Sequence, residues 1–441
     1  MKILLLFTAL LLGLPAMAVY RDGVLYLKID EGQKTCRIDQ GVDVGDTLII
    51  PSSVMFDDIE FSVTEIGDKA FYESKLRSVT IPSSVKSIGE SAFEKSLLLE
   101  SVELSAGLLS IGERAFGGCV SLAGIDLPES LESVGDSFLA ECSGLEGIYV
   151  NESNPYYSDI DGVLFNKDIS RLVQYPGARS GSYAVPSTVL EIGAYAFYSH
   201  NFLEGVTLPE ELEAIGKCAF SNCPLTSVEF PLSLKEIGEM AFSNCSLKEA
   251  IVPEGVRVIK DVFEGNATLE TVRMYGGFDE VSSPVDLCSG IREVYYITDE
   301  LQADNGGYVN MGGHQEPWFY YVAGSIDWGF LDRGSSDVYW EDKDLAEIRY
   351  PEATLYVLSS VYDKIKNDCI SPWSYFKHIE IYDPSGDPYV SAVDDITEDF
   401  TPQIVAVYTL GGLKVSDSIE GLRPGFYIVR HSDKVEKIVV R

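Results

Sequence analysis

The stretch Ile111-Gly112-Glu113-Arg114-Ala115-Phe116-Gly117-Gly118-Cys119 decides the fold of this chain, because it is one copy of a phrase that recurs. Other copies begin at Ile66, Ile88, Val134, Ile192, Ile215, Ile237 and Val258. One apolar column runs through all copies, and its members are Phe71, Phe93, Phe116, Leu139, Phe197, Phe220, Phe242 and Phe263. Successive members are 22, 23, 23, 58, 23, 22 and 21 residues apart. A fixed period in this range predicts a solenoid, in which each coil buries its apolar side only against neighbouring coils.

The full repeat at residues 76–93 indicates how each coil should fold. Val79 and Ile81 alternate with Thr80, which is typical of a short strand with one buried face. Gly89 is expected to permit a turn with positive φ. We expect the strands of successive coils to pair in parallel and to form one continuous sheet.

The step of 58 residues holds one repeat plus a long insertion. Within it, residues 161–168 and 171–176 predict a hairpin about Asn166–Ser170. We expect this variant coil, residues 150–185, to lie within the stack and not to form a separate domain.

Length and charge restrict the class of protein. At 441 residues the chain is too long for one ordinary core, which predicts several modules or an elongated repeat array. Its formal net charge is −36, from 69 acidic and 33 basic residues. Such a field repels nucleic acid and anionic membrane surfaces, and favours solubility or the binding of cations and basic partners. We therefore expect no nucleic-acid partner.

The first 18 residues have the pattern of a secretory signal peptide. One basic residue, Lys2, precedes an apolar run that ends in Ala16-Met17-Ala18, which predicts cleavage after Ala18. The run is short for a membrane span, and no later stretch reaches that length. The first cysteine is Cys36, which argues against a lipoprotein anchor at the cleavage point. The predicted localisation is secreted or at the outer cell surface.

We expect the chain to have six parts. They are the signal peptide (1–18), an N-terminal cap hairpin with a first partial repeat (19–61), the repeat solenoid (62–275), irregular repeats with a C-terminal cap (276–382), an acidic linker (383–400) and a C-terminal β-module (401–441). After Tyr275 the full phrase is expected to be lost, with only its strand half echoed. The β-module should have three strands, at 404–408, 425–430 and 435–440.

Four of the eight cysteines, Cys119, Cys142, Cys223 and Cys245, share one repeat position. Other copies place Ser, His or Asn there, so we expect a small buried turn residue with a free thiol. Disulfides between neighbouring coils stay open as an alternative, because stacked positions lie about 5 Å apart. No Cys-x-x-Cys pair indicates zinc. We predict no metal and no cofactor.

The recurring phrase Leu-x-x-Val-x-Ile-Pro-x-x-Val-x-x-Ile-Gly-x-x-Ala-Phe-x-x-Cys resembles the BspA-like class of bacterial leucine-rich repeat proteins. The resemblance covers roughly residues 47–275, and the variant coil with residues 354–377 extends it to about 382. It implies an α/β-type, mostly β, right-handed superhelix of 22–23-residue coils with a parallel sheet, followed by the small β-module. It also implies a surface or secreted protein that binds host matrix proteins or other cells, without enzyme activity and without a fixed set of binding residues.

The β-module itself resembles a second family. Val407-Tyr408 with Gly411-Gly412, followed by Gly425–Val429, is similar to the type IX secretion sorting modules of Gram-negative anaerobes. A β-cap without a sorting function is the alternative.

Residues that carry chemistry are few. The four histidines, His200, His314, His378 and His431, are scattered. No Gly-x-Ser-x-Gly, His-Glu-x-x-His, Walker or Gly-x-Gly-x-x-Gly motif is present. Carboxylate pairs of the glycosidase type stay open, but in so acidic a chain any two carboxylates are weak evidence. We predict that the protein is not an enzyme.

Two surfaces are candidates for binding a partner. The first is the outward column of the strands, at Thr80, Glu103, Asp126, Tyr149, Thr207 and Glu229. Small and acidic side chains there predict a shallow surface for a basic, extended protein partner, with a merely solvated sheet face as the alternative. The second is the aromatic stretch within 298–344, at Trp318, Tyr321, Trp328 and Trp340. Exposed rings would stack on sugar or peptide, whereas buried rings would form the core of a cap.

Together these observations predict a monomeric, secreted or surface-exposed adhesin-like protein that binds host matrix or basic peptide segments. A carbohydrate-binding accessory protein that uses residues 298–344 is one alternative. A structural surface or spacer protein is the other.

Overall fold

The computed structural model describes residues 18–42, 44–276, 280–281, 284–297, 308–311, 314–317, 350–367, 376–383, 404–409, 414–416, 425–431 and 435–440. They fall into two compact units. The first comprises the described residues up to Val228 with Glu236–Ser246 and Asp261–Asn266. The second comprises Glu229–Lys235, Leu247–Lys260 and the described residues from Ala267 onward.

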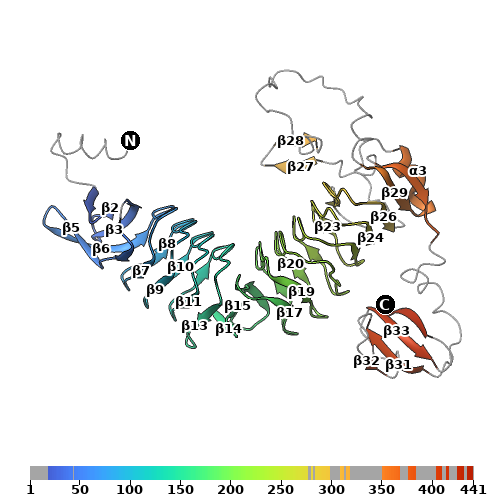
Figure 1. Cartoon of the computed structure of the whole chain (residues 1–441), viewed down its shortest axis with the longest axis horizontal. Coiled ribbons are helices and arrows are strands. Elements are labelled where there is room, and N and C mark those ends of the chain that lie inside the picture. The colour runs from blue at the N-terminus through green and yellow to red at the C-terminus, as the bar shows by residue number, and fades with distance from the viewer. Residues whose placement is uncertain are drawn as a thin grey trace, which may run out of the picture. The chain divides into compact units, whose positions relative to one another are not determined.

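In the first unit, most coils contribute one longer strand to a parallel series (Figure 1). These strands are β4 (Thr47–Ile49), β7 (Ser78–Ile81), β9 (Ser101–Leu104), β11 (Gly124–Leu127), β13 (Gly147–Val150), β17 (Gly181–Ala184) and β19 (Leu203–Thr207). They form three sheets, β4–β7–β9, β11–β13 and β17–β19. Parallel pairing is therefore confirmed, but the prediction of one continuous sheet is wrong. The variant coil separates β13 from β17 along the chain, and nothing in the contacts explains the interruption between β9 and β11.

A second series of strands comes from the Ser-Ile half of the phrase, and most of its members have only two residues. They are β6 (Ile59–Ile66), β8 (Ser87–Ile88), β10 (Ser110–Ile111), β12 (Ser133–Val134), β16 (Arg171–Gln174), β18 (Glu191–Ile192), β20 (Ala214–Ile215) and β21 (Glu236–Ile237). Ile66 pairs with Ile88, and Ile88 with Ile111, all in parallel register. Each coil is therefore fixed to its neighbour on two sides.

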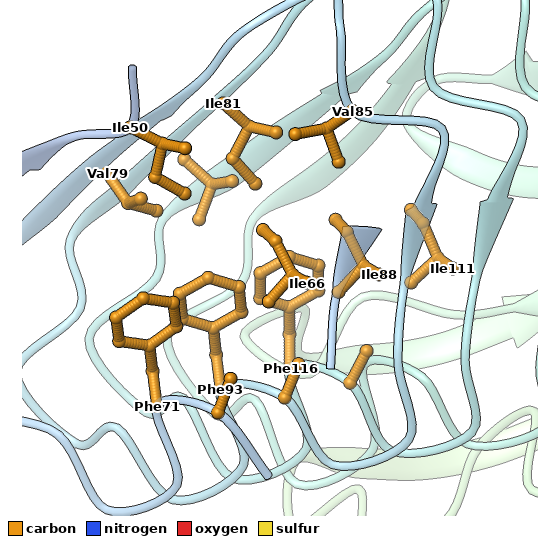
Figure 2. Close-up of a cluster of buried hydrophobic side chains, with 14 of the residues drawn as sticks. Ile50, Ile66, Phe71, Val79, Ile81, Val85, Ile88, Phe93, Ile111 and Phe116 are labelled. Atoms are coloured by element: carbon orange, nitrogen blue, oxygen red, sulfur yellow. The ribbon is translucent and has the colours of Figure 1, made fainter. Parts of the chain in front are cut away.

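The core between the two series is a set of stacked columns (Figure 2). The rings of Phe71, Phe93 and Phe116 lie in a row, with successive centroids 5.0 and 5.2 Å apart and nearly parallel planes. All three side chains are buried. Burying a ring of this size removes a large apolar area from water, which explains why the column tolerates little variation.

The turn around each Phe repeats the same backbone conformation. Arg114 and Gly118, two residues before and after Phe116, have φ of 51° and 71°. The amide of Phe93 donates to the Ala115 carbonyl in the next coil at 2.7 Å. Positive φ recurs at the equivalent places of the other regular coils, which include Lys69, Ser91, Ser137, Cys218 and Met240.

The glycine of the phrase has a different role from the one predicted. Gly89 and Gly112 do not have positive φ. A Cβ added to Gly112 would lie 2.7 Å from the Glu90 amide nitrogen and from the Gly89 carbonyl carbon. A Cβ on Gly135 would lie 2.3 Å from the amide nitrogen of Glu113. The column requires glycine because successive backbones approach each other closely, so the prediction of a glycine-dependent turn is wrong.

The variant coil lies in the first unit as a three-stranded insertion. The strands β14 (Tyr157–Ile160) and β15 (Val163–Asn166) pair antiparallel with each other, and β15 pairs antiparallel with β16. The predicted hairpin is therefore confirmed. Tyr175 then takes the place of a Phe, because its ring stacks 4.8 Å from Phe197 and its amide donates to the Ala196 carbonyl.

The N-terminal end of the stack is closed by antiparallel strands. The strands β1 (Ala18–Arg21), β2 (Val24–Asp30) and β3 (Thr35–Gly41) form a meander, β3 pairs in parallel with β6, and β5 (Ser53–Phe56) forms a hairpin with β6. Antiparallel strands at this position cover the edge that an open solenoid would expose.

The second unit has the same arrangement of parallel strands, one from each coil. Its strands β22 (Glu249–Val252), β24 (Thr271–Tyr275), β26 (Glu293–Ile297), β29 (Tyr350–Val357) and β30 (Phe376–Ile381) form one parallel sheet. The helix α3 (Ser359–Asn367) follows β29. A separate hairpin joins β27 (Tyr308–Met311) and β28 (His314–Pro317).

The repeat phrase extends further than predicted. The strand β25 (Glu280–Val281) pairs in parallel with β23 (Val258–Ile259), as the Ser-Ile strands do in other coils. Val285 and Cys288 are both 2% exposed and stand where the Phe and Cys columns would continue. The phrase is therefore not lost at Tyr275, although Val replaces Phe and conceals the match.

The C-terminal described residues form a four-stranded antiparallel sheet in the order β32–β31–β33–β34. Its strands are β31 (Ile404–Thr409), β32 (Lys414–Ser416), β33 (Gly425–His431) and β34 (Val435–Val440). The three predicted strands are present, and the short β32 was missed.

Candidate functional site

The outward column of the first unit begins with residues that contact each other. Thr80 on β7 and Glu103 on β9 are paired in register. The Thr80 hydroxyl donates to Glu103 Oε2 at 3.1 Å. Glu103 is exposed, while Val79 and Val102 on the opposite face of the same strands are buried. The strand alternation therefore places the predicted residues on the solvent side, as expected.

Asp126 and Tyr149 form the next pair, between β11 and β13. The Tyr149 side chain is 50% exposed. A Cβ added to Gly147 would lie only 2.6–3.1 Å from the Tyr149 ring and hydroxyl, and one added to Gly162 would lie 3.4 Å from the ring. The two glycines thus provide a flat backbone surface on which the ring lies, and half of the Tyr149 side chain stays open to solvent beside the exposed carboxylate of Asp126.

The remaining two members of the column lie elsewhere. Thr207 is the exposed last residue of β19, in the sheet that β19 forms with β17. Glu229 is exposed but does not belong to a strand, so its prediction as an outward strand residue is wrong. The structure therefore brings together Thr80 with Glu103 and Asp126 with Tyr149, but not all six residues.

The aromatic candidates lie outside the described residues. Trp318, Tyr321, Trp328 and Trp340 belong to the part of the chain between 318 and 349 that the structure does not describe. The second predicted surface therefore stays a prediction.

Sequence reasoning missed an aromatic extension of the outward column in the second unit. Arg273 on β24 pairs in register with Tyr295 on β26, and its guanidinium carbon lies 3.9 Å from the Tyr295 ring centroid. Tyr356 on β29 stacks on the other side, with centroids 4.6 Å apart. The alternation of side chains in residues 293–297 and 354–357 was the signal that could have found this extension.

The cysteine column is a row of hydrogen-bond donors. The thiols of Cys119, Cys142, Cys223 and Cys245 donate to the carbonyl oxygens of Phe93, Phe116, Phe197 and Phe220, at 3.0–3.2 Å. Ser96 donates to the Phe71 carbonyl at 3.0 Å, and Asn266 donates to the Phe242 carbonyl at 2.7 Å. Each side chain therefore satisfies a buried carbonyl of the preceding coil, which explains why Cys, Ser and Asn alternate there.

The thiols themselves are free and buried. Burial raises the pKa of Cys119 and of Cys223 to about 12. A thiol that stays protonated at neutral pH is a poor nucleophile and a poor metal ligand. The disulfide alternative is not what the structure has, and the column is structural.

Among the residues that the structure describes, no group of three or more His, Cys, Asp or Glu side chains is placed to hold a metal ion. Within the same residues, no helix is long and apolar enough to cross a membrane.

Comparison with known families agrees with the repeat pattern. The family described as "BspA type Leucine rich repeat region" matches in 6 copies over residues 54–168 and 184–299, which is more than half of the chain. The chain belongs to the BspA-type leucine-rich repeat family. A search of curated proteins gave no match to the sequence. Membership in this family fits a protein-binding role.

Solved structures resemble this BspA-type chain as well. The pneumococcal vaccine antigen PcpA has a TM-score of 0.55 and 20% sequence identity, over 83% of this chain and 98% of that one. At this identity the likeness shows the fold alone. A leucine-rich repeat protein from Bacteroides capillosus is 31% identical over 31% of this chain and 99% of its own, with a TM-score of 0.29. One from Bacteroides ovatus is 22% identical over 64% and 84%, with a TM-score of 0.39.

Proposed function

We propose that the outward strand face of the first unit binds an extended, basic segment of a protein partner. The observation that carries this proposal is the exposed Tyr149 ring on its glycine surface, with the exposed carboxylates of Asp126 and Glu103 on the preceding strands. A tyrosine that is held flat loses little conformational freedom when a partner covers it.

The charges favour a cationic partner. A Lys or Arg side chain laid over the Tyr149 ring would gain a cation–π contact, and its charged end would meet Asp126. The net charge of −36 would also accelerate the approach of a basic partner and would make binding sensitive to salt.

A direct test compares two peptides on the full chain by isothermal titration calorimetry. One is an extended peptide rich in Lys and Arg, and the other has the same length with Glu at those positions. We expect binding of the basic peptide that weakens as salt is raised, and no binding of the acidic one. Equal binding of both peptides, or of neither, would contradict the proposal.

The wider biological role is part of the same proposal. We propose a monomeric, adhesin-like protein that reaches the outer surface or the medium after cleavage of its signal peptide behind Ala18, and that binds host matrix or cell proteins without catalysing a reaction. The β31–β34 module is proposed to act as a type IX sorting module. The division of the chain into six parts is also a proposal, with the repeats continuing beyond Tyr275 into the fourth part. An array of matrix proteins, probed with the mature chain, tests the adhesin role, and the absence of any bound matrix protein would count against it.

A further inference from the structure

The stack of coils in the first unit is interrupted where the coil of residues 132–142 meets the variant coil. In the preceding coil, the amides of Arg114, Phe116 and Gly118 donate to carbonyls of the following coil. The equivalent amides are those of Ser137, Leu139 and Glu141, and among the described residues none of the three has an acceptor. The regular hydrogen-bonded surface of a coil is therefore left open here.

The ladder of short strands breaks at the same place. The strand β12 pairs with β10 but with no strand of the variant coil. The amide of Val134 instead donates to the Tyr157 hydroxyl oxygen at 3.1 Å. The insertion separates β12 from the variant coil. The strand β16 pairs with β15 and with β18, so it does not pair with β12.

A cavity of about 270 Å³ lies at this interruption of the stack. Glu132, Asp136 and Ser137 line it on one side, and Tyr156, Arg171 and Gln174 line it on the other. Ser137 is only 3% exposed and Gln174 only 4%. Ser137 and Gln174 therefore form a buried polar end of the cavity, while Glu132, Asp136 and Tyr156 lie where it opens to solvent.

Some buried polar groups in the wall do not use all of their hydrogen-bonding capacity. The Ser137 amide has no acceptor in the described part of the chain. Gln174 Nε2 donates to the Ala196 carbonyl at 3.2 Å, which leaves its side-chain oxygen as an acceptor in the wall. Arg171 Nε lies 3.0 Å from Glu191 Oε1, so its charge is paired, and the half-exposed guanidinium still has donors to offer to a ligand. Buried polar groups without partners are costly, so a ligand that satisfies them would bind favourably.

The lining selects a neutral, hydroxyl-rich ligand. The carboxylates of Glu132 and Asp136 oppose an anion, and the guanidinium of Arg171 opposes a free cation. Donors and acceptors are mixed, which suits hydroxyl groups, since each of them both donates and accepts. Tyr156 is 48% exposed and offers a ring face for stacking against C–H groups.

We propose that this cavity binds one neutral sugar ring, as a free monosaccharide or as the terminal unit of a glycan. The volume lies near the lower end of the range for small-molecule sites, which limits the occupant to a single ring inside the cavity. The site is independent of the outward strand face, so either one can exist without the other.

Ligand-observed NMR tests the proposal on the full chain. The probes are the methyl glycosides of neutral hexoses and of N-acetylhexosamines, with inorganic phosphate as a separate arm. We expect saturation transfer to at least one glycoside and none to phosphate. The variants Tyr156→Ala and Arg171→Gln should each weaken that binding about fivefold or more. Tyr20→Ala, which removes a tyrosine of similar exposure (52%) from β1, should leave it unchanged.

Three outcomes would overturn the sugar site. They are the absence of a signal with every glycoside, binding of phosphate in preference to the glycosides, and a glycoside signal that neither lining variant changes. Thermal melting of each variant distinguishes a lost site from a lost fold, since both substitutions are at half-exposed side chains outside the ring column.

Discussion

The Phe column and the outward strand column of the first unit pass through the same coils but differ in burial and in variability. Phe71, Phe93 and Phe116 are buried and stacked on one another. Glu103, Asp126 and Tyr149 are exposed and differ in size and charge from coil to coil. Stacking fixes the chemistry of the first column, whereas nothing in the fold fixes that of the second. The difference indicates that residues of the outward strand column can vary to suit a binding partner, whereas those of the Phe column cannot.

Removal of a ring from the Phe column should have the largest effect on stability. Phe116→Ala deletes a ring from the middle of the stack, and we expect a loss of about 3–5 kcal/mol in the free energy of unfolding. Phe263→Ala should cost less, because the Phe242 and Phe263 rings are already 6.3 Å apart and tilted by 34°. Chemical denaturation of the three proteins measures both. Small and equal losses would mean that the column is not the main core.

The glycine column offers a second way to break the stack. Gly112→Ala would place a Cβ 2.7 Å from the backbone of the preceding coil, and we expect a cost of about 3 kcal/mol. Gly124→Ala is the matched control, because its Cβ would meet its nearest neighbour at an ordinary 3.5 Å. Thermal melting should separate the two variants. If both melt alike, close approach between coils does not explain the glycine.

The stability that the cysteine column provides should depend on the hydrogen bond that each side chain donates, and not on the presence of sulfur. Cys142→Ala leaves the Phe116 carbonyl without the thiol that donates to it at 3.1 Å. We expect it to be about 0.5–1.5 kcal/mol less stable than Cys142→Ser, which keeps a donor, because the Phe116 carbonyl still accepts from the Cys119 amide in both variants. Unfolding in denaturant measures the difference. Equal stability of the Ala and Ser variants would show that the position requires only a small residue.

The same thiols predict a dependence on pH. Burial raises the pKa of Cys119 and of Cys223 from 9.0 to about 12, so an unfolded chain ionises these thiols before the folded chain does. Their contribution to stability is complete below pH 9 and is lost as the pH rises toward 12. From pH 9 to 10 we expect a loss of roughly 1 kcal/mol for each thiol.

The double variant Cys119→Ser/Cys223→Ser provides the control for this pH effect. Serine keeps a donor at each position but does not titrate in this range, so the fall in stability between pH 9 and 10 should be smaller than in the native sequence. An identical fall in both proteins would show that other groups, and not these thiols, set the alkaline limit.

The architecture could be predicted from the sequence because the repeat forces one packing solution. The phrase at residues 111–119 predicted the coils, the parallel strands and the buried Phe. It did not predict the second strand series, since two residues such as Ser110–Ile111 are too short to show alternation. Tyr175 stands 22 residues before Phe197, on the period, but was missed because Gln174-Tyr175 replaces the Ala-Phe pair of the phrase.

The candidate site was less predictable than the fold. Alternation correctly placed Glu103 and Tyr149 on the solvent side, but Glu229 proved to lie outside any strand. The cavity beside Ser137 exists because the variant coil does not accept hydrogen bonds from the backbone amides there. No local sequence pattern indicates this. Register in the second unit likewise brings Tyr295 to Tyr356 across a long stretch of intervening sequence.

Substitutions on the outward face should have the smallest effect on stability. Tyr149→Ala and Asp126→Asn alter exposed side chains, and we expect each to change the free energy of unfolding by less than about 0.5 kcal/mol. Thermal melts check this. A large loss would assign these residues to the scaffold and remove them from the candidate site.

The most direct test of the central claim is a charge reversal on this face with a matched control. Glu103→Lys/Asp126→Lys reverses the exposed carboxylates on β9 and β11, the two strands of this series that precede Tyr149. Glu90→Lys/Glu113→Lys makes the same change in net charge on exposed residues of the turn side. Calorimetric titration with the basic peptide should show binding by the control and loss of binding by the strand-face variant. Equal affinities in the two variants would show that the outward strand face does not form the binding surface.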